Sequence, residues 1–121
     1  MGLFSVDIEV IGFEQHEAEE HTALVDTGAS YLSLPATALE RLGYRSLGMQ
    51  RVIFADGSAA LWPITEVKVR LESRERTVIA FMAEAGAPSL IGAQTLETFG
   101  LGVDPLGLRL IPVDAYLAGV N

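Results

Sequence analysis

The sequence is divided into short apolar segments by turn-forming residues, and this spacing limits the fold more than any other feature. Between Phe4 and Val10 apolar and polar residues alternate strictly, which is the period of a strand with one buried face. Similar segments follow at intervals of roughly 8–12 residues. The pattern predicts a mainly β protein, closed as a barrel or sandwich, rather than alternating β/α units.

The strands are interrupted by turn signals and by two short helical segments. A helix is expected over Pro35 to Gly43, with proline in its first turn and glycine after its last, and another over Ala93 to Phe99. The acidic stretch Glu14 to His21 is expected at a solvated hairpin tip, and Gly102 to Gly107 at a turn. The expected strands are Phe4 to Val10, Thr22 to Val25, Gln50 to Phe54, Leu61 to Leu71, Thr77 to Met82 and Leu108 to Val113.

Length and composition fit one globular domain spanning residues 1–121, since no linker or low-complexity segment divides the 121 residues. The sequence has no cysteine, which excludes a disulfide framework and a thiolate metal site. A net charge of −8 disfavours nucleic-acid binding, because non-specific affinity for a polyanion comes from surface cations. Neither a signal peptide nor a membrane span is evident, so a cytoplasmic protein without membrane attachment is expected.

The segment Ala23 to Ser30 places a carboxylate, Asp26, directly after an apolar strand. A carboxylate in such a place is costly to bury unless it has partners. Gly28 allows the backbone to turn sharply, and its amide and the Thr27 hydroxyl can donate to Asp26. This segment resembles the hallmark of aspartic peptidases, an apolar pair followed by Asp-Thr-Gly-Ala or Asp-Thr-Gly-Ser.

Two further segments extend the resemblance to the retropepsin-like (clan AA) aspartic peptidases over roughly residues 3 to 113. Leu90-Ile91-Gly92 looks like the family's second apolar-apolar-Gly element, and it echoes the first one. The Asp56-Gly57 turn signal lies between the two elements, where the family has its mobile flap. The resemblance implies a closed acid-protease barrel lobe with one or two short helices.

The number of catalytic carboxylates in the sequence indicates the oligomeric state. Aspartic peptidases use two carboxylates that share a proton, and this chain has one Asp-Thr-Gly, at Asp26. The second carboxylate is therefore expected from a second copy in a two-fold symmetric homodimer. The resemblance implies peptide-bond hydrolysis by general acid–base activation of water, with Asp26, Thr27 and Gly28 as catalytic residues and no cofactor or metal.

The peptide substrate is expected to bind in an extended conformation, with strand-like hydrogen bonds to the flap. The expected substrate-binding residues are Ala29, Ser30, Ala55, Asp56, Gly57 and Ser58. Ala29 lacks the hydroxyl that a serine there would offer to the ionised carboxylate, so an optimum less acidic than that of digestive aspartic peptidases is expected.

Some positions depart from the retroviral type, and the sequence leaves several alternatives open. Ser30 and Ala93 stand where retroviral enzymes commonly have an acid–arginine ion pair, and the Asp104-Pro105 turn looks closer to cellular or prokaryotic relatives. Trp62 fits either packing at the base of the flap or a substrate pocket. His16 and His21 fit solvated loop positions, although a metal site with neighbouring glutamates is conceivable. A catalytically silent dimerisation or peptide-binding domain is the main alternative function.

Overall fold

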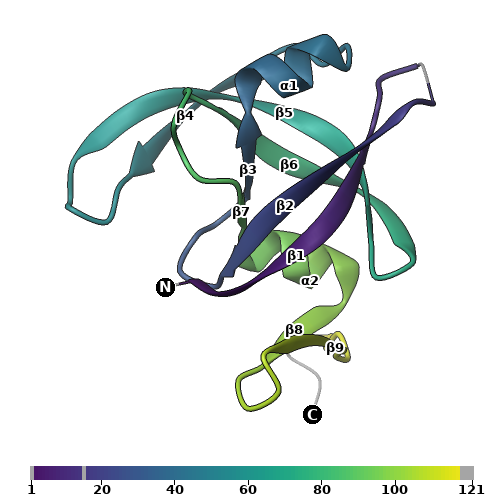
Figure 1. Cartoon of the computed structure of the whole chain (residues 1–121). Coiled ribbons are helices and arrows are strands. Elements are labelled where there is room, and N and C mark those ends of the chain that lie inside the picture. The colour runs from purple at the N-terminus through teal and green to yellow at the C-terminus, as the bar shows by residue number, and fades with distance from the viewer. Residues whose placement is uncertain (1, 15, 118–121) are drawn as a thin grey trace.

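The computed structural model describes residues 2–14 and 16–117, and only the backbone of residues 2 and 3. It consists of strands with two short helices (Figure 1). The helices are α1 (Ala36–Arg41) and α2 (Ala93–Phe99). The strands are β1 (Gly2–Ile11), β2 (Ala18–Asp26), β3 (Leu32–Pro35), β4 (Gly48–Ile53), β5 (Ala59–Leu71), β6 (Arg74–Ala83), β7 (Leu90–Ile91), β8 (Leu101–Asp104) and β9 (Arg109–Pro112).

Within the described residues, seven strands form one sheet in the order β1-β2-β7-β3-β6-β5-β4. The sheet closes into a barrel because β1 also pairs with β5, from Glu9 opposite Arg70 to Ile11 opposite Lys68. The hydroxyl of Tyr44 extends this closure by donating to the Ile11 carbonyl and accepting from the Lys68 amide. The mainly β, closed fold expected from the sequence is therefore confirmed.

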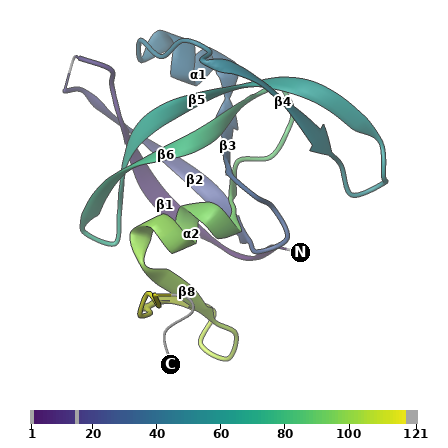
Figure 2. The same ribbon diagram turned by 180° about the vertical axis from the view of Figure 1, so that it is seen from behind.

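The barrel interior is filled by alternate residues of its strands, as the period of two requires. Leu96 and Phe99 of α2 close the lower end, where the helix lies beneath the barrel (Figure 2). Phe81, Leu96 and Phe99 are all buried. The main core also contains Ile8, Val10, Val25, Leu32, Leu34, Leu39, Val67, Val69, Ala80 and Ile91.

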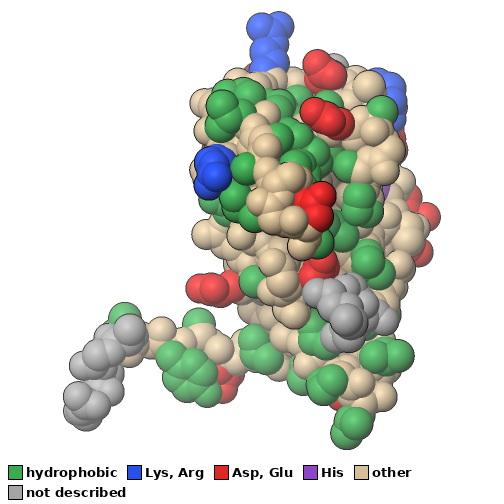
Figure 3. All heavy atoms as spheres, turned by 90° about the vertical axis from the view of Figure 1, so that its left-hand side faces the viewer, with side chains coloured by type: hydrophobic (Ala, Val, Ile, Leu, Met, Phe, Trp, Pro, Cys, Tyr) green, Lys and Arg blue, Asp and Glu red, His purple; other side chains and the backbone are tan. Residues whose placement is uncertain are grey.

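The long strand β5 belongs to two structures at once. Its second half pairs with β6 in the barrel, from Ile64 opposite Phe81 to Leu71 opposite Arg74. Its first half pairs with β4 and forms a hairpin that extends away from the barrel (Figure 1). We call residues 48–64 the projecting hairpin. Hydrophobic side chains gather on the side of the molecule where this hairpin lies (Figure 3). The large exposed hydrophobic residues of the hairpin are Met49, Ile53 and Leu61.

The observed elements differ from the expected ones in three places. The hairpin tip after β1 is shorter than Glu14 to His21, because β2 already begins at Ala18 and pairs with β1. The short strand β3 was not expected at all. Residues from Gly102 onward do not form a turn followed by one strand but the β8–β9 hairpin, with Gly102 opposite Ile111.

Candidate active site

Asp26 is the last residue of β2, and the backbone turns directly after it. The Gly28 amide donates to Asp26 Oδ1 at 2.9 Å, and the Ala29 amide donates to the Asp26 carbonyl at 3.0 Å. A hydrogen bond donated to a carboxylate oxygen, such as the one from Gly28, favours the ionised form of the carboxylate and fixes its orientation. The expected role of the Gly28 amide as a donor to Asp26 is confirmed.

The two similar segments, Leu24 to Gly28 and Leu90 to Gly92, begin in neighbouring strands of the sheet. Strand β7 runs parallel to β2, with Leu24 opposite Leu90 and Val25 opposite Ile91. The residues that follow β7 then bind the turn after Asp26. The amide of Ala93 donates to the Ala29 carbonyl at 2.8 Å, and that of Gln94 donates to the Ser30 carbonyl at 2.9 Å.

Gly92 makes this contact possible. A Cβ at Gly92 would lie 2.6 Å from both the Ser30 carbonyl carbon and the Tyr31 oxygen, which is too close for any side chain. The backbones of the Asp26 turn and of the α2 start therefore touch directly. Ser30 and Ala93, the two positions without the retroviral ion pair, lie on either side of this contact. Main-chain hydrogen bonds join the two segments here.

A groove of about 1060 Å³ lies between the Asp26 turn and the projecting hairpin. Of the residues expected in the site, Asp26, Gly28, Ala29, Ser30 and Ala55 line this groove. Thr27 is exposed and does not line it. Asp56, Gly57 and Ser58 also lie outside the lining, at the tip of the hairpin.

The tip of the projecting hairpin is ordered by its own hydrogen bonds. The amide of Phe54 donates to the Ser58 carbonyl at 2.8 Å, and that of Gly57 donates to the Phe54 carbonyl at 2.9 Å. The Ser58 hydroxyl and amide both donate to Asp56 Oδ1, at 2.6 and 2.9 Å. These bonds from Ser58, the hydroxyl first, hold the pKa of Asp56 below its ordinary value.

An aromatic cluster of four rings forms one wall of the groove, and sequence reasoning did not place Tyr31 or Phe81 there. The ring centroids are 5.3 Å apart for Tyr31 and Phe81, 5.9 Å for Phe81 and Trp62, and 5.3 Å for Trp62 and Phe54. Such tilted and edge-on contacts are the favoured arrangements of aromatic pairs. Trp62 packs against Phe54 and Phe81 at the base of the hairpin, and it also lines the groove.

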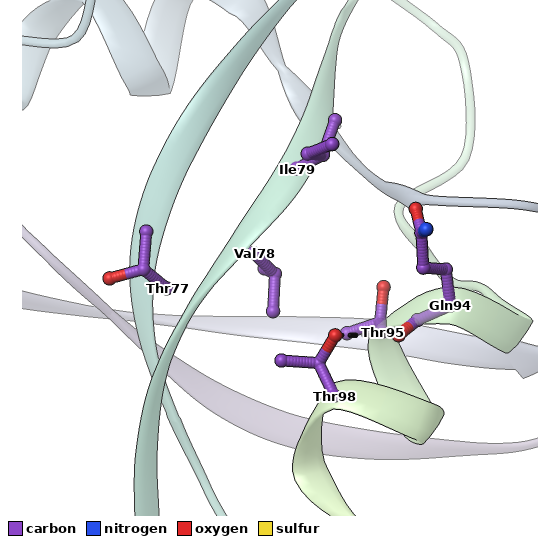
Figure 4. Close-up of a pocket in the computed structure, with 6 residues that line it drawn as sticks. All are labelled: Thr77, Val78, Ile79, Gln94, Thr95 and Thr98. Atoms are coloured by element: carbon purple, nitrogen blue, oxygen red, sulfur yellow. Dashed lines mark hydrogen bonds between the residues drawn. The ribbon is translucent and has the colours of Figure 1, made fainter. Parts of the chain in front are cut away.

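A second, smaller cavity of about 140 Å³ lies between β6 and α2 (Figure 4). It is lined by Val78 and Ile79 and by polar side chains that include Thr95, whose buried hydroxyl has no hydrogen-bond partner among the described residues. The Thr98 hydroxyl donates to the Gln94 carbonyl at 2.9 Å. None of the residues that line this cavity is ionisable, so it offers no acid–base pair.

Within residues 2–14 and 16–117, no group of three or more His, Asp or Glu side chains is arranged to hold a metal ion. His21 lies in β2 rather than in a loop, and its Nε2 is 2.9 Å from Glu19 Oε1. His16 is exposed. Neither helix of the described chain is long and apolar enough to cross a membrane.

Comparison with solved structures places this barrel beside viral proteases. The chain superimposes on the EIAV protease in complex with an inhibitor with a TM-score of 0.58 and 17% identity, covering 88% of this chain and 90% of that one. It superimposes on the Simian Foamy Virus (mac) protease with a TM-score of 0.55 and 12% identity, covering 78% and 92%. At such low identity these matches establish the fold. A comparison with curated protein sequences gives no match.

The match of the sequence to a known family identifies the family of this chain. Residues 15–98, well over half of the chain, match the family described as gag-polyprotein putative aspartyl protease. The matched range contains the Asp26 turn, the projecting hairpin and the Leu90-Ile91-Gly92 element. The chain therefore belongs to the gag-polyprotein putative aspartyl protease family and has the retropepsin-like aspartic protease fold.

Proposed function

We propose that this chain is an aspartic endopeptidase that works as a homodimer, with Asp26 of each copy forming the catalytic pair. The observation that carries the proposal is the position of Asp26. Its carboxylate is oriented by the Gly28 amide, and Asp26 lines a groove of about 1060 Å³. Membership of an aspartyl protease family supports the same chemistry. The whole of residues 1–121 is taken as one peptidase domain.

The homodimer follows from the number of carboxylates that the chemistry needs. Two carboxylates about 3 Å apart cannot both ionise, and aspartic peptidases use this shared proton. The groove is lined by two acidic residues, Asp26 and Glu84, and only Asp26 has the Thr-Gly sequence after it. Thr27 and Gly28 are exposed, so a second copy can approach this turn about a two-fold axis.

In the proposed mechanism, the ionised Asp26 of one copy takes a proton from a bound water, and the resulting nucleophile attacks the peptide carbonyl. The protonated Asp26 of the other copy donates its proton to the carbonyl oxygen, which gives a tetrahedral diol. The first Asp26, which now holds the proton taken from water, then donates it to the leaving nitrogen as the C–N bond breaks, while the other Asp26 recovers its proton from the diol. The apparent pKa values of the reaction belong to the pair rather than to either residue. No metal or organic cofactor takes part.

The substrate is proposed to be an extended peptide held between the Asp26 turn and the projecting hairpin, which acts as the flap. Ala29, Ser30 and Ala55 line the groove and are proposed to contact the peptide. Asp56, Gly57 and Ser58 are proposed to reach it when the hairpin closes. The chain is proposed to be cytoplasmic and closer to cellular and prokaryotic relatives than to viral enzymes. No nucleic acid or membrane is proposed as a partner.

The test is digestion of a mixed peptide pool by wild type and by Asp26→Ala from about pH 4 to 7.5, read by mass spectrometry. We expect cleavage by wild type and a loss of at least about a thousandfold in Asp26→Ala. Equal cleavage by two protein preparations checked for purity would show that the cleavage does not depend on Asp26, and would contradict its catalytic role.

The alternative is a silent domain that binds peptides or dimerises without turnover. The Asp26→Asn variant separates the two functions, because it keeps the shape of the groove and removes one charge. A binding domain keeps its peptide affinity in this variant and shows no turnover in wild type. A peptidase loses its turnover in the variant and retains peptide binding.

A further inference from the structure

The indole N–H of Trp62 is a buried donor without an acceptor. Trp62 is 8% exposed, and its Nε1 has no hydrogen-bond partner within the described part of the chain. A buried N–H group that lacks an acceptor costs free energy, and native proteins nearly always pair such groups. Since Trp62 lines the groove, a bound ligand is the partner that can supply the missing acceptor.

The rings of the aromatic cluster belong to two parts of the fold, the projecting hairpin and the barrel. Phe54 and Trp62 belong to the projecting hairpin, whereas Phe81 lies in β6 of the barrel and Tyr31 follows the Asp26 turn. Strand β4 pairs with β5 alone, and Trp62 precedes Ile64, the first residue of β5 that pairs with β6. A hinge movement near Ile64 would part Trp62 from Phe81 and open a space between the two pairs of rings.

We propose that this space is a substrate subsite for an uncharged amide side chain, glutamine or asparagine, whose carbonyl oxygen accepts the hydrogen bond from Trp62 Nε1. The inference rests on the proposed function, because it assigns a preference to the same groove. The aromatic rings on both sides pack against the flat amide and its methylene groups. The amide N–H groups have the Glu84 carboxylate in the same groove as an acceptor.

Charge distinguishes the amides from the corresponding acids. Among the residues that line the groove, Asp26 and Glu84 are acidic and Arg51 is basic, and the whole chain carries a net charge of −8. A glutamate entering between the rings would be both repelled and stripped of water, which is costly for a charged group. Methionine and leucine fit the same space but leave Nε1 without a good acceptor. The subsite should therefore disfavour both acidic side chains and apolar side chains of similar size.

The probes are randomised hexapeptide mixtures in which one position is fixed as glutamine, methionine or glutamate. Cleavage by wild type is measured for each fixed position, with Asp26→Ala as the blank. At one position we expect glutamine to be favoured over methionine by about tenfold, as expected for a donor that loses its acceptor. The Trp62→Phe variant keeps an aromatic ring but lacks the N–H, and it should abolish this preference. Phe54→Leu, which changes packing without removing a donor, should keep it.

Binding gives a second readout that does not depend on turnover. The chain has a single tryptophan, so the emission of Trp62 in Asp26→Asn reports directly on this subsite. Glutamine mixtures should change the emission at about tenfold lower concentration than methionine mixtures. A glutamine preference without cleavage would contradict the peptidase and support the subsite. Cleavage with equal use of glutamine and methionine, or an unchanged ratio in Trp62→Phe, would overturn the subsite alone.

Discussion

At the scale of single residues, the turn after β2 is fixed by main-chain contacts on both of its sides. Ala29 uses its amide to bind the Asp26 carbonyl and its carbonyl to bind the Ala93 amide. Its side chain is the part that a substitution can change while these bonds are kept. Gly92 leaves no such freedom, because the backbone of Ser30 and Tyr31 occupies the place of a side chain.

Replacing Gly92 with alanine should therefore destabilise the protein. The new methyl group would overlap the Ser30 and Tyr31 backbone and push α2 away from the Asp26 turn. We expect a loss of about 1–3 kcal/mol in the free energy of unfolding, measured by urea titration, together with reduced peptidase activity. Gly48→Ala is the matched control, because a Cβ at Gly48 meets nothing within 4 Å. An equal effect of the two variants would contradict this role of Gly92.

Replacing Ala29 with serine should move the acid limb of the activity profile to lower pH. Ala29 lines the groove beside Asp26, so a hydroxyl there can donate to the ionised carboxylate. A hydrogen bond to the charged form lowers a carboxylate pKa, and the base then stays ionised in more acidic solution. The check is the pH dependence of kcat/KM for one peptide with both proteins, and coincident acid limbs would refute this effect.

Individual residues also show where sequence reasoning succeeds and where it stops. The Asp26 turn was predictable because each of its residues has a local chemical reason to be there. The aromatic cluster was not, because Tyr31 and Phe81 are 50 positions apart and meet only through the sheet. The buried state of Trp62 Nε1 likewise depends on neighbours that no local pattern specifies.

At the scale of elements, the Asp56 carboxylate helps to stabilise the tip of the projecting hairpin. Asp56 accepts two hydrogen bonds from Ser58, and these bonds hold the pKa of Asp56 below its ordinary value of 3.8. Since the folded pKa is the lower one, the stabilisation of the tip is fully present above pH 3.8. It is lost as the pH falls through the lowered pKa.

An NMR titration of the Asp56 carboxyl carbon tests this dependence. We expect a midpoint below 3.8 in wild type and a higher midpoint in Ser58→Ala, because the variant loses the hydroxyl donor. The Ser58 amide resonance should titrate with the same midpoint as the carboxyl in wild type. Identical midpoints in the two proteins would show that the hydroxyl does not stabilise the charged form.

The elements that were predicted wrongly have local physical explanations. Glu19 and His21 looked like solvated loop residues, but both are accommodated in β2, where Arg41 and His21 contact Glu19. Gly102 suggested a turn, yet here it lets a strand lie against Val113, whose Cγ1 is 2.8 Å from where a Cβ would be. The alternation of Leu32 and Leu34 about Ser33 could have indicated β3, although a strand of 4 residues gives a weak signal.

At the scale of the whole molecule, the decisive feature is that each chain carries half of the proposed catalytic pair. Mixing wild type with an equal amount of Asp26→Asn should therefore inhibit it. If only dimers of two wild-type chains are active and chains exchange freely, the mixture retains about one quarter of the activity of the same total amount of wild type. Chains acting independently would retain about one half. Dimer formation in both proteins is checked by sedimentation equilibrium.

The arrangement of β2 and β7 also determines when, during synthesis, the site can exist. Asp26 is synthesised before residues 90–94, which supply the strand beside it and the amides that hold its turn. Chains are made at about 5–20 residues per second, so for several seconds the growing polypeptide has its carboxylate without the support that orients it. The proposed catalytic turn can therefore be assembled only after residues 90–94 have been synthesised, and the parallel pairing of two distant strands sets this order.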